Sequence, residues 1–190
     1  MMQITVLVSD VNYDSITAEE AKKRLGSPFG IVGGATKIIP HDVKRKLAIK
    51  FIKSKEKKIL GYLSKSLDKK GFPITFQSLE VSDASESGME MELRINLGDI
   101  DYAAIATTVY ENKERWLTRS EKASEILSYV DVAGGQLTVD YISSLPQETK
   151  DGLVGFFLTK YSNKITSALN KYIRKKKWDL TLTEVRIKTF

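Results

Sequence analysis

The sequence predicts an α+β fold in which one strand–helix–strand unit occurs twice. Aligning residues 40–83 with residues 146–189, without a gap, gives 11 identities in 44 positions. About three identities would be expected by chance at ordinary residue frequencies. Within each copy the spacing of apolar residues changes from the period of a strand to that of a helix and back. We therefore predict an internal duplication.

The beginnings of the two copies match at a different offset. Residues 4–16 align with residues 93–105, which lie 89 positions later, whereas the first match has an offset of 106. We assign residues 1–86 to repeat one and residues 87–190 to repeat two, both within a single domain. The change of offset implies about 17 extra residues in repeat two, which we expect as an inserted helical segment within residues 106–145.

Each repeat is expected to begin with a strand that buries one face. Across residues 89–97, apolar and polar side chains alternate without exception, which is typical of a half-buried strand. The polar face of this strand is predicted to be open and to carry Glu90, Glu92, Arg94 and Asn96. The aligned strand of repeat one is expected to bury Ile4, Val6 and Val8. It is expected to expose Thr5, Leu7 and Ser9.

Each repeat continues with its longest helix. Apolar residues recur at helical spacing over residues 43–67 and 153–172, so each helix has a stripe that faces the core. Pro40 and Pro146 precede the two stripes, as is common at helix starts.

Each repeat ends with a strand in which the alternation of apolar residues slips by one position. It holds as far as Phe76 and resumes in the other phase at Leu79; in repeat two it holds as far as Leu182 and resumes at Val185. One extra residue that breaks the period is typical of a β-bulge. We therefore predict two bulges, near Gln77-Ser78 and near Thr183-Glu184.

The four strands are expected to join one sheet with the helices on one face, because a two-stranded sheet is marginal in water. The short connection at residues 82–88 favours a hairpin of strands two and three. A two-fold relation between the repeats then gives a mainly antiparallel sheet of order 4-1-3-2, the ferredoxin-like arrangement. Strands two and four become edges, where bulges concentrate and where Pro73 is tolerated.

The composition excludes several kinds of chemistry. The chain has no cysteine and one histidine, which excludes disulfides, thiolate catalysis and metal centres built from cysteines or several histidines. It also lacks an Asp-rich calcium loop and a glycine-rich phosphate motif. His41 is interpreted as an exposed residue at a helix start. We expect no catalytic residue, no metal and no cofactor, and favour a protein that is not an enzyme.

The chain shows no secretion signal, and no apolar run approaches the length of roughly 20 residues that a membrane span needs. Together with the missing cysteines, this predicts a cytoplasmic protein that does not contact membranes. The net charge of +6 gives a weak preference for acidic partners.

Two polar pairs recur in both repeats: Asp10 with Tyr13, and Asp99 with Tyr102. They could form a paired acidic site. Alternatively, each Asp caps the helix that follows it, and each Tyr packs at the sheet edge with its hydroxyl in water. We favour this structural interpretation.

A row of lysines is the strongest functional candidate. On the predicted helix over residues 42–70, four lysines fall within an arc of about 60°: Lys46, Lys50, Lys53 and Lys57. The row could contact phosphates of a nucleic acid or an acidic protein, or it could be a solvated face that only aids solubility. Repeat two lacks it, because the matching residues are Gly152, Phe156, Thr159 and Asn163.

Three functions are compatible with this sequence. We favour a non-catalytic interaction or scaffolding domain that binds a protein partner or self-associates. The first alternative is binding of nucleic acid or another acidic partner through the lysine row. Against nucleic acid, the predicted open sheet face lacks the aromatic pairs that stack bases in RNA-binding sheets. The second alternative is a small ligand bound between sheet and helices.

Overall fold

The computed structural model describes residues 2–25, 38–84, 89–111 and 144–189. Most of the insertion predicted within residues 106–145 lies outside these ranges. In chain order the described elements are β1 (Met2–Ser9), α1 (Tyr13–Leu25), α3 (His41–Ser54), α4 (Glu56–Asp68), β2 (Ile74–Asp83), β3 (Met91–Ile100), α5 (Tyr102–Glu111), α9 (Gln147–Lys175) and β4 (Thr181–Thr189).

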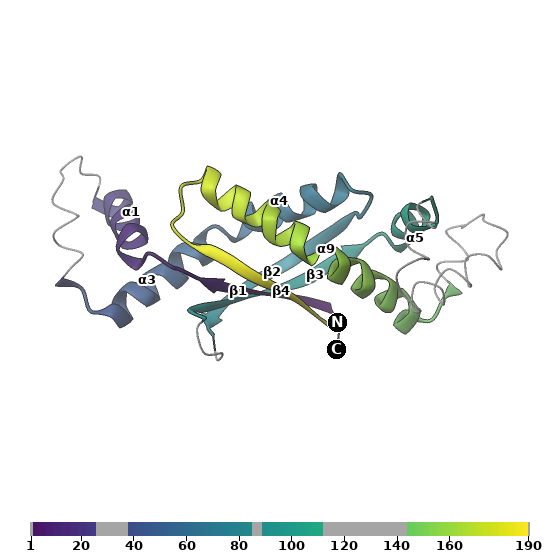
Figure 1. The fold of residues 1–190 in the computed structure, drawn as a ribbon, viewed down its shortest axis with the longest axis horizontal. Coiled ribbons are helices and arrows are strands. Elements are labelled where there is room, and N and C mark those ends of the chain that lie inside the picture. Colours follow the sequence, from purple (N-terminus) through teal and green to yellow (C-terminus); the bar gives the residue numbers. More distant parts are fainter. Residues whose placement is uncertain (1, 26–37, 85–88, 112–143, 190) are drawn as a thin grey trace.

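The four strands form one antiparallel sheet of order β2-β3-β1-β4 (Figure 1). Read from the other edge, this is the predicted order 4-1-3-2, so the α+β class, the antiparallel sheet and the strand order are confirmed. Each half of the chain places its first strand in the centre and its second at an edge. Neither half could form this sheet alone, because its own two strands are not neighbours.

One hydrophobic core lies between the sheet and the helices. Helix α4 packs against β2, helix α9 packs against β4, and the two helices contact each other over the sheet (Figure 1). Core residues form rows across the strands; Val6, for example, pairs with Leu93 on one side and Val185 on the other. All three are buried, and burial of such apolar surface is the main driving force for folding.

The opposite face of β1 is less open than the sequence predicts. The exposed fractions of Thr5 and Leu7 are only 2% and 1%, so the prediction that they are exposed is wrong. The residues that pair with them on the flanking strands are long and charged: Glu92, Arg94, Glu184 and Arg186. The two ion pairs of these residues measure 2.5 Å in β3 and 2.8 Å in β4. Glu92, also expected to be exposed, is buried. Flanking side chains of this length can shield a central strand, which the strand's own pattern does not indicate.

Both predicted bulges are present. The register between β2 and β3 skips Gln77, and the register between β4 and β1 skips Thr183. These two positions correspond to each other in the internal sequence match. A further irregularity, which the sequence does not predict, lies in β3 opposite Thr75. There the Thr75 hydroxyl accepts a hydrogen bond from the backbone N–H of Asp99 at 2.7 Å.

The first long helix is interrupted, so the prediction of one helix over residues 42–70 is wrong. Helix α3 ends at Ser54 and α4 begins at Glu56, whereas α9 is continuous. At the break Lys55 has φ −101° and ψ 5°, and its N–H donates to the carbonyl of Ile52, one residue closer than in an α-helix. The Ser54 hydroxyl also donates to a carbonyl of the last turn, that of Phe51, at 2.6 Å.

Side chains from the helical layer bind the free edges of the sheet. Next to the helix break, Glu56 accepts a hydrogen bond from the Leu79 N–H at 2.8 Å, and the Lys53 ammonium donates to the Leu79 carbonyl. At the other edge, the Asn170 amide donates to the carbonyl of Leu182 and accepts from its N–H, both at 2.9 Å. Occupied edge groups cannot pair with another chain.

Aromatic residues join the two halves. Phe72, just before β2, stacks on Phe157 of α9 with ring centroids 5.0 Å apart. Trp178, just before β4, packs on Phe51 of α3 with centroids 5.4 Å apart. In the internal sequence match, Phe72 corresponds to Trp178 and Phe51 corresponds to Phe157. Each half therefore inserts the aromatic residue of its final turn against the helix of the other half.

The helices α4 and α9 end in turns of the same type. The residue before each aromatic has a left-handed backbone, with φ 79° at Gly71 and 56° at Lys177. The N–H of Phe72 donates to the carbonyl of Leu67, and the N–H of Trp178 donates to that of Ile173, both at 3.1 Å. This is the Schellman pattern, which satisfies carbonyls at a helix C-terminus.

Candidate functional site

The two recurring Asp–Tyr pairs lie at opposite ends of the sheet, at the starts of α1 and α5, and form no common site (Figure 1). Tyr13 is buried, and its ring packs edge-on against His41 with centroids 5.0 Å apart. Its hydroxyl donates a hydrogen bond to the carboxylate of Glu90. Burial, and then the carboxylate of Glu90, raise the pKa of Tyr13 well above its ordinary value.

Tyr102 makes equivalent contacts in the second half. Its hydroxyl donates to the carboxylate of Asp151 and accepts from the amide of Gln147, both at 2.9 Å. Burial, and then Asp151, raise the pKa of Tyr102. Gln147 is the first residue of α9, and His41 is the first residue of α3. Each tyrosine thus joins the start of its own helix to the start of α3 or α9. The prediction that the tyrosine hydroxyls lie in water is wrong, because both are hydrogen-bonded to carboxylates of the protein.

The aspartates do not cap the helices, and that prediction is wrong. The cap of α1 is Asn12, whose side-chain oxygen accepts from the N–H of Ser15 at 3.0 Å. The cap of α5 is Asp101, which accepts from the N–H of Ala104 at 2.9 Å. Each helix begins two residues later than the predicted cap requires. Asp10 instead occupies a turn with φ 52° after β1.

The predicted lysine row is divided by the helix break. Lys46 and Lys50 are exposed on α3, whereas Lys57 is exposed on α4. Lys53 binds the Leu79 carbonyl and lies 3.2 Å from the carboxylate of Glu56. The second of these contacts contributes to a lowered pKa of Glu56, although the main cause is the hydrogen bond from Leu79. Lys53 therefore has a structural partner, and the four lysines do not form one continuous row.

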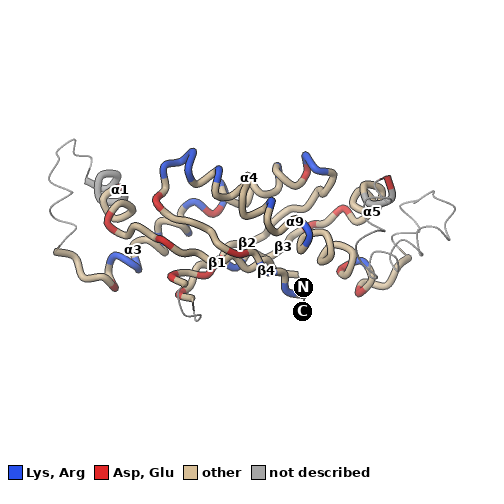
Figure 2. Tube along the Cα trace, in the orientation of Figure 1, with Lys and Arg blue, Asp and Glu red and all other residues tan. Residues whose placement is uncertain are grey.

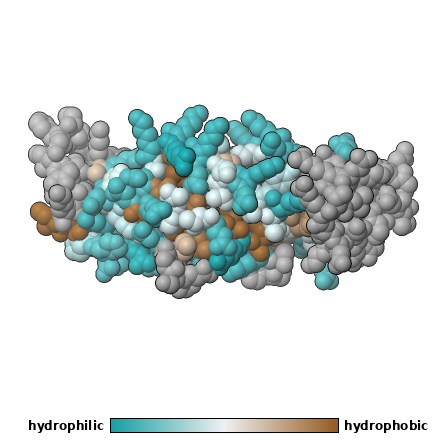
Figure 3. All heavy atoms as spheres, viewed as in Figure 1, coloured by the Kyte–Doolittle hydropathy of each residue, from teal (hydrophilic) through white to brown (hydrophobic). Residues whose placement is uncertain are grey.

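The strongest charge asymmetry lies elsewhere, on the helical side of the molecule. Residues 57–70 and 152–177 contain twelve basic side chains and one acidic side chain, Asp68. We call the surface formed by these two segments the basic layer. The rest of the chain contains 18 basic and 23 acidic residues. Figure 2 shows Lys and Arg gathered over α4 and α9. In the space-filling view, long hydrophilic side chains project from this side (Figure 3).

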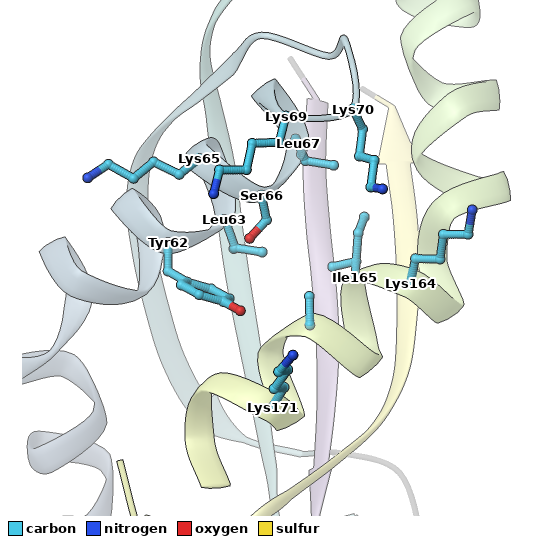
Figure 4. A pocket seen from close by; sticks show the side chains of 11 residues that line it. Tyr62, Leu63, Lys65, Ser66, Leu67, Lys69, Lys70, Lys164, Ile165 and Lys171 are labelled. Carbon is cyan, nitrogen blue, oxygen red and sulfur yellow. The ribbon is translucent and has the colours of Figure 1, made fainter. Parts of the chain in front are cut away.

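A groove of about 770 Å³ opens in the basic layer between α4 and α9. Five exposed lysines line it: Lys65, Lys69, Lys70, Lys164 and Lys171. Apolar side chains of the core, including Leu63 and Ile165, form its floor, and Tyr62 and Ser66 contribute hydroxyl groups (Figure 4). In this view Lys70 from the end of α4 and Lys164 from α9 lie at the same end of the groove, whereas the side chain of Lys65 points away.

The groove has a strongly positive lining. None of the described residues that line it is acidic, and none of its five lysines forms an ion pair with a described residue. The ammonium group of Lys164 lies 4.7 Å from the ring centroid of Tyr161. Unpaired cations around a hollow attract anions, and they do so more strongly at low ionic strength.

The sequence carries a signal for this layer that does not appear as a row of lysines on one helix face. Residues 152–177 have seven basic and no acidic side chains, but these are spread around the helix. Only the contact between α4 and α9 places them beside the lysines of residues 57–70.

In the described part of the chain, two hollows lie between the sheet and the helices. One, of about 460 Å³, is at the end of the sheet between α4 and β2–β3 and is lined by Asp68, Thr75 and Asp99 among others. The other, lined by core residues such as Ile95 and Trp178, has a volume of about 20 Å³. Small-molecule sites usually measure several hundred Å³. The core centre is therefore too tightly packed for a small-molecule ligand, whereas the hollow beside Asp99 has that size.

Comparisons with known proteins find no matching family model, no matching curated protein and no matching solved structure. In the part of the chain that the structure describes, no helix combines the length and apolar character needed to cross a membrane. Across the same residues, no three His, Cys, Asp or Glu side chains form a group that could hold a metal ion.

Proposed function

We propose that this protein is a non-catalytic binding protein that engages an acidic partner through the basic layer. The observation that carries the proposal is the separation of charge: twelve basic residues and one acidic residue lie in two helical segments of a chain whose remainder is net negative. Stability does not require this separation, because like charges on one surface repel each other. A complementary partner would relieve that repulsion.

We also propose that the chain arose by duplication and belongs to the ferredoxin-like arrangement, with repeats 1–86 and 87–190. Both bulges, both helix-ending turns and both interlocking aromatic contacts fall at positions that correspond in the internal sequence match. Superposition of the two halves of an experimental structure would test this. The matched strands and helices should overlay with one rotation, and separate rotations for helix and sheet would contradict it.

The binding proposal can be tested by retention on heparin, a generic polyanion. We expect the wild-type protein to be retained at about 0.15 M salt, where screening has a Debye length of about 8 Å. A triple variant of the basic layer, Lys58→Glu, Arg174→Glu and Lys175→Glu, should elute at clearly lower salt.

A matched control has the same change in net charge outside the basic layer: Lys46→Glu, Lys50→Glu and Lys188→Glu. It includes two members of the lysine row predicted from sequence. We expect its elution to change much less. Equal shifts in the two triple variants, or no retention of the wild type, would contradict the proposal. All three proteins should have similar melting temperatures, because every substituted residue is exposed.

A further inference from the structure

The groove between α4 and α9 differs from the rest of the basic layer because its hydrogen-bond donors surround a hollow. Lys69 and Lys70 follow the end of α4, and Lys164 and Lys171 project from α9. The groove therefore presents ammonium groups from both of its walls (Figure 4). An anion inside it would be contacted from more than one direction.

Two hydroxyl groups add neutral donors to this lining. Tyr62 and Ser66 lie on α4, and both side chains extend into the groove (Figure 4). A matching ligand needs several acceptor oxygens that point in different directions and more than one negative charge. A phosphate group is tetrahedral and carries a charge of about −1.5 to −2 at neutral pH with three strong acceptor oxygens. A carboxylate offers two oxygens in one plane and a single charge.

The other half of the molecule shows that the groove is not a requirement of the helix packing. In the internal sequence match, Ser66 corresponds to Tyr172. Tyr172 is buried, and its ring packs 4.6 Å from that of Tyr62 and 5.6 Å from that of Trp178. The second half thus has a large ring where the first half has a small hydroxyl side chain. The small residue leaves space beside α4 that an equivalent ring would occupy.

We infer that the groove between α4 and α9 is a binding site for phosphate groups. The inference rests on the proposed function and specifies its ligand chemistry. The phosphates could belong to a free polyphosphorylated molecule or to the backbone of a nucleic acid. A backbone phosphate carries a single charge, so a nucleic acid would have to place at least two neighbouring phosphates in the groove. In both cases Lys70 and Lys164 would contact the phosphates. Its volume of about 770 Å³ is within the range of sites that enclose small ligands.

The test uses inorganic tripolyphosphate as the probe, with isothermal titration calorimetry of the full chain at low salt. Lys70→Gln combined with Lys164→Gln should weaken binding at least tenfold. The control, Lys58→Gln combined with Lys175→Gln, removes the same charge from the basic layer outside the groove and should change affinity less than threefold. Ser66→Tyr, which introduces the ring found at the matching position, should weaken binding without changing the charge.

Two further ligands identify the source of the phosphates. A nucleic acid would be indicated by a short single-stranded oligonucleotide that competes with tripolyphosphate. The slope of its log affinity against log salt concentration should then decrease by the equivalent of about two phosphate contacts in the Lys70/Lys164 variant. Binding of tripolyphosphate without competition would indicate a small ligand. Polyglutamate that binds as tightly as the phosphate ligands would overturn the inference and indicate an acidic protein.

The outcomes separate the inference from the proposed function. If heparin retention depends on the basic layer but tripolyphosphate binds no better to the wild type than to the Lys70/Lys164 variant, only the inference fails. If the wild-type protein is not retained on heparin, the proposed function fails as well. Thermal unfolding of each variant shows whether it is folded; should Ser66→Tyr unfold, the lysine variants still decide the result.

Discussion

In the described part of the chain, the two halves of this protein differ in their long helices and agree in the contacts that join them. In the first half the helix breaks at Lys55, and the side chains beside the break bind Leu79 at the edge of β2. In the second half the helix is continuous, and a single residue, Asn170, binds Leu182 at the edge of β4. Each edge is therefore bound by side chains at one residue, Leu79 or Leu182, but by different residue types. Backbone groups at an edge must be satisfied in either half, whereas the side chains that satisfy them can vary.

The largest expected effect concerns the aromatic residues that the halves exchange. Phe72→Ala and Trp178→Ala should each lower the free energy of unfolding by about 3–5 kcal/mol, because each leaves a cavity in the shared core. Urea denaturation measures both. Phe156→Ala is the control, since Phe156 is only partly buried, and should have a smaller effect. A loss below about 1 kcal/mol for one of the pair, far under the usual cost of such a cavity, would show that the two halves do not contribute equally to the core.

The helix-ending turns should respond in opposite directions to substitution. Gly71→Ala should destabilise the protein by about 2 kcal/mol, because φ is positive there and a Cβ would lie 2.4 Å from the Thr108 hydroxyl. Lys177→Gly should stabilise it by up to about 1 kcal/mol, since glycine adopts the left-handed conformation without strain. Melting temperatures of both variants test this prediction.

Gly61→Ala serves as the control for these turns. It lies inside α4, and nothing lies within 4 Å of the added Cβ, so it should stabilise the protein by about 0.5–1 kcal/mol. A destabilising Lys177→Gly would indicate that the lysine side chain contributes more than the backbone strain costs.

The two edge contacts should differ in their dependence on pH. Glu56→Ala and Asn170→Ala should each cost about 1 kcal/mol at neutral pH. The folded-state pKa of Glu56 is lowered, so its contribution is present above the ordinary glutamate pKa and is lost as the pH falls through the lowered value. The destabilisation by Glu56→Ala should therefore shrink in acid, whereas that of Asn170→Ala should stay constant. Urea unfolding at pH 7 and near pH 3 measures the difference; equal pH dependence would contradict it.

The smallest effect at neutral pH is expected at the tyrosines that begin α1 and α5. The folded-state pKa values of Tyr13 and Tyr102 are raised, so their contribution is fully present below the ordinary pKa near 10 and is lost as the pH rises above it. Tyr13→Phe should make the protein less sensitive to unfolding above pH 10. Tyr102→Phe should have the same effect to a smaller extent. Unfolding curves at pH 8 and pH 11 test this, and an unchanged alkaline loss in Tyr13→Phe would contradict it.

The sequence alone was sufficient to predict the α+β class, the strand order and both bulges. These features depend on periodicity, which is a property of neighbouring residues. The slip between Phe76 and Leu79 changes the face that later side chains occupy, whatever the rest of the chain does. Strand order followed from the short β2–β3 connection together with a symmetry assumption.

Other features were decided only by contacts between distant residues. Thr5 and Leu7 are buried because β1 lies between two strands with long charged side chains. The helix break accompanies binding of the β2 edge by Lys53 and Glu56, and both of these residues are far from Leu79 in the sequence. The local sequence around the helix break does not indicate a contact with Leu79, and the local sequence around Leu79 does not indicate one with the helix break.

The basic layer shows the same division. The sequence by itself determined that residues 152–177 carry many cations and no acids, but on a single helix such residues are a solvated surface. Packing of α4 against α9 placed two basic segments, distant in the chain, around one groove. Tertiary structure decides this because electrostatic potential depends on distances in space, and the sequence specifies only distances along the chain.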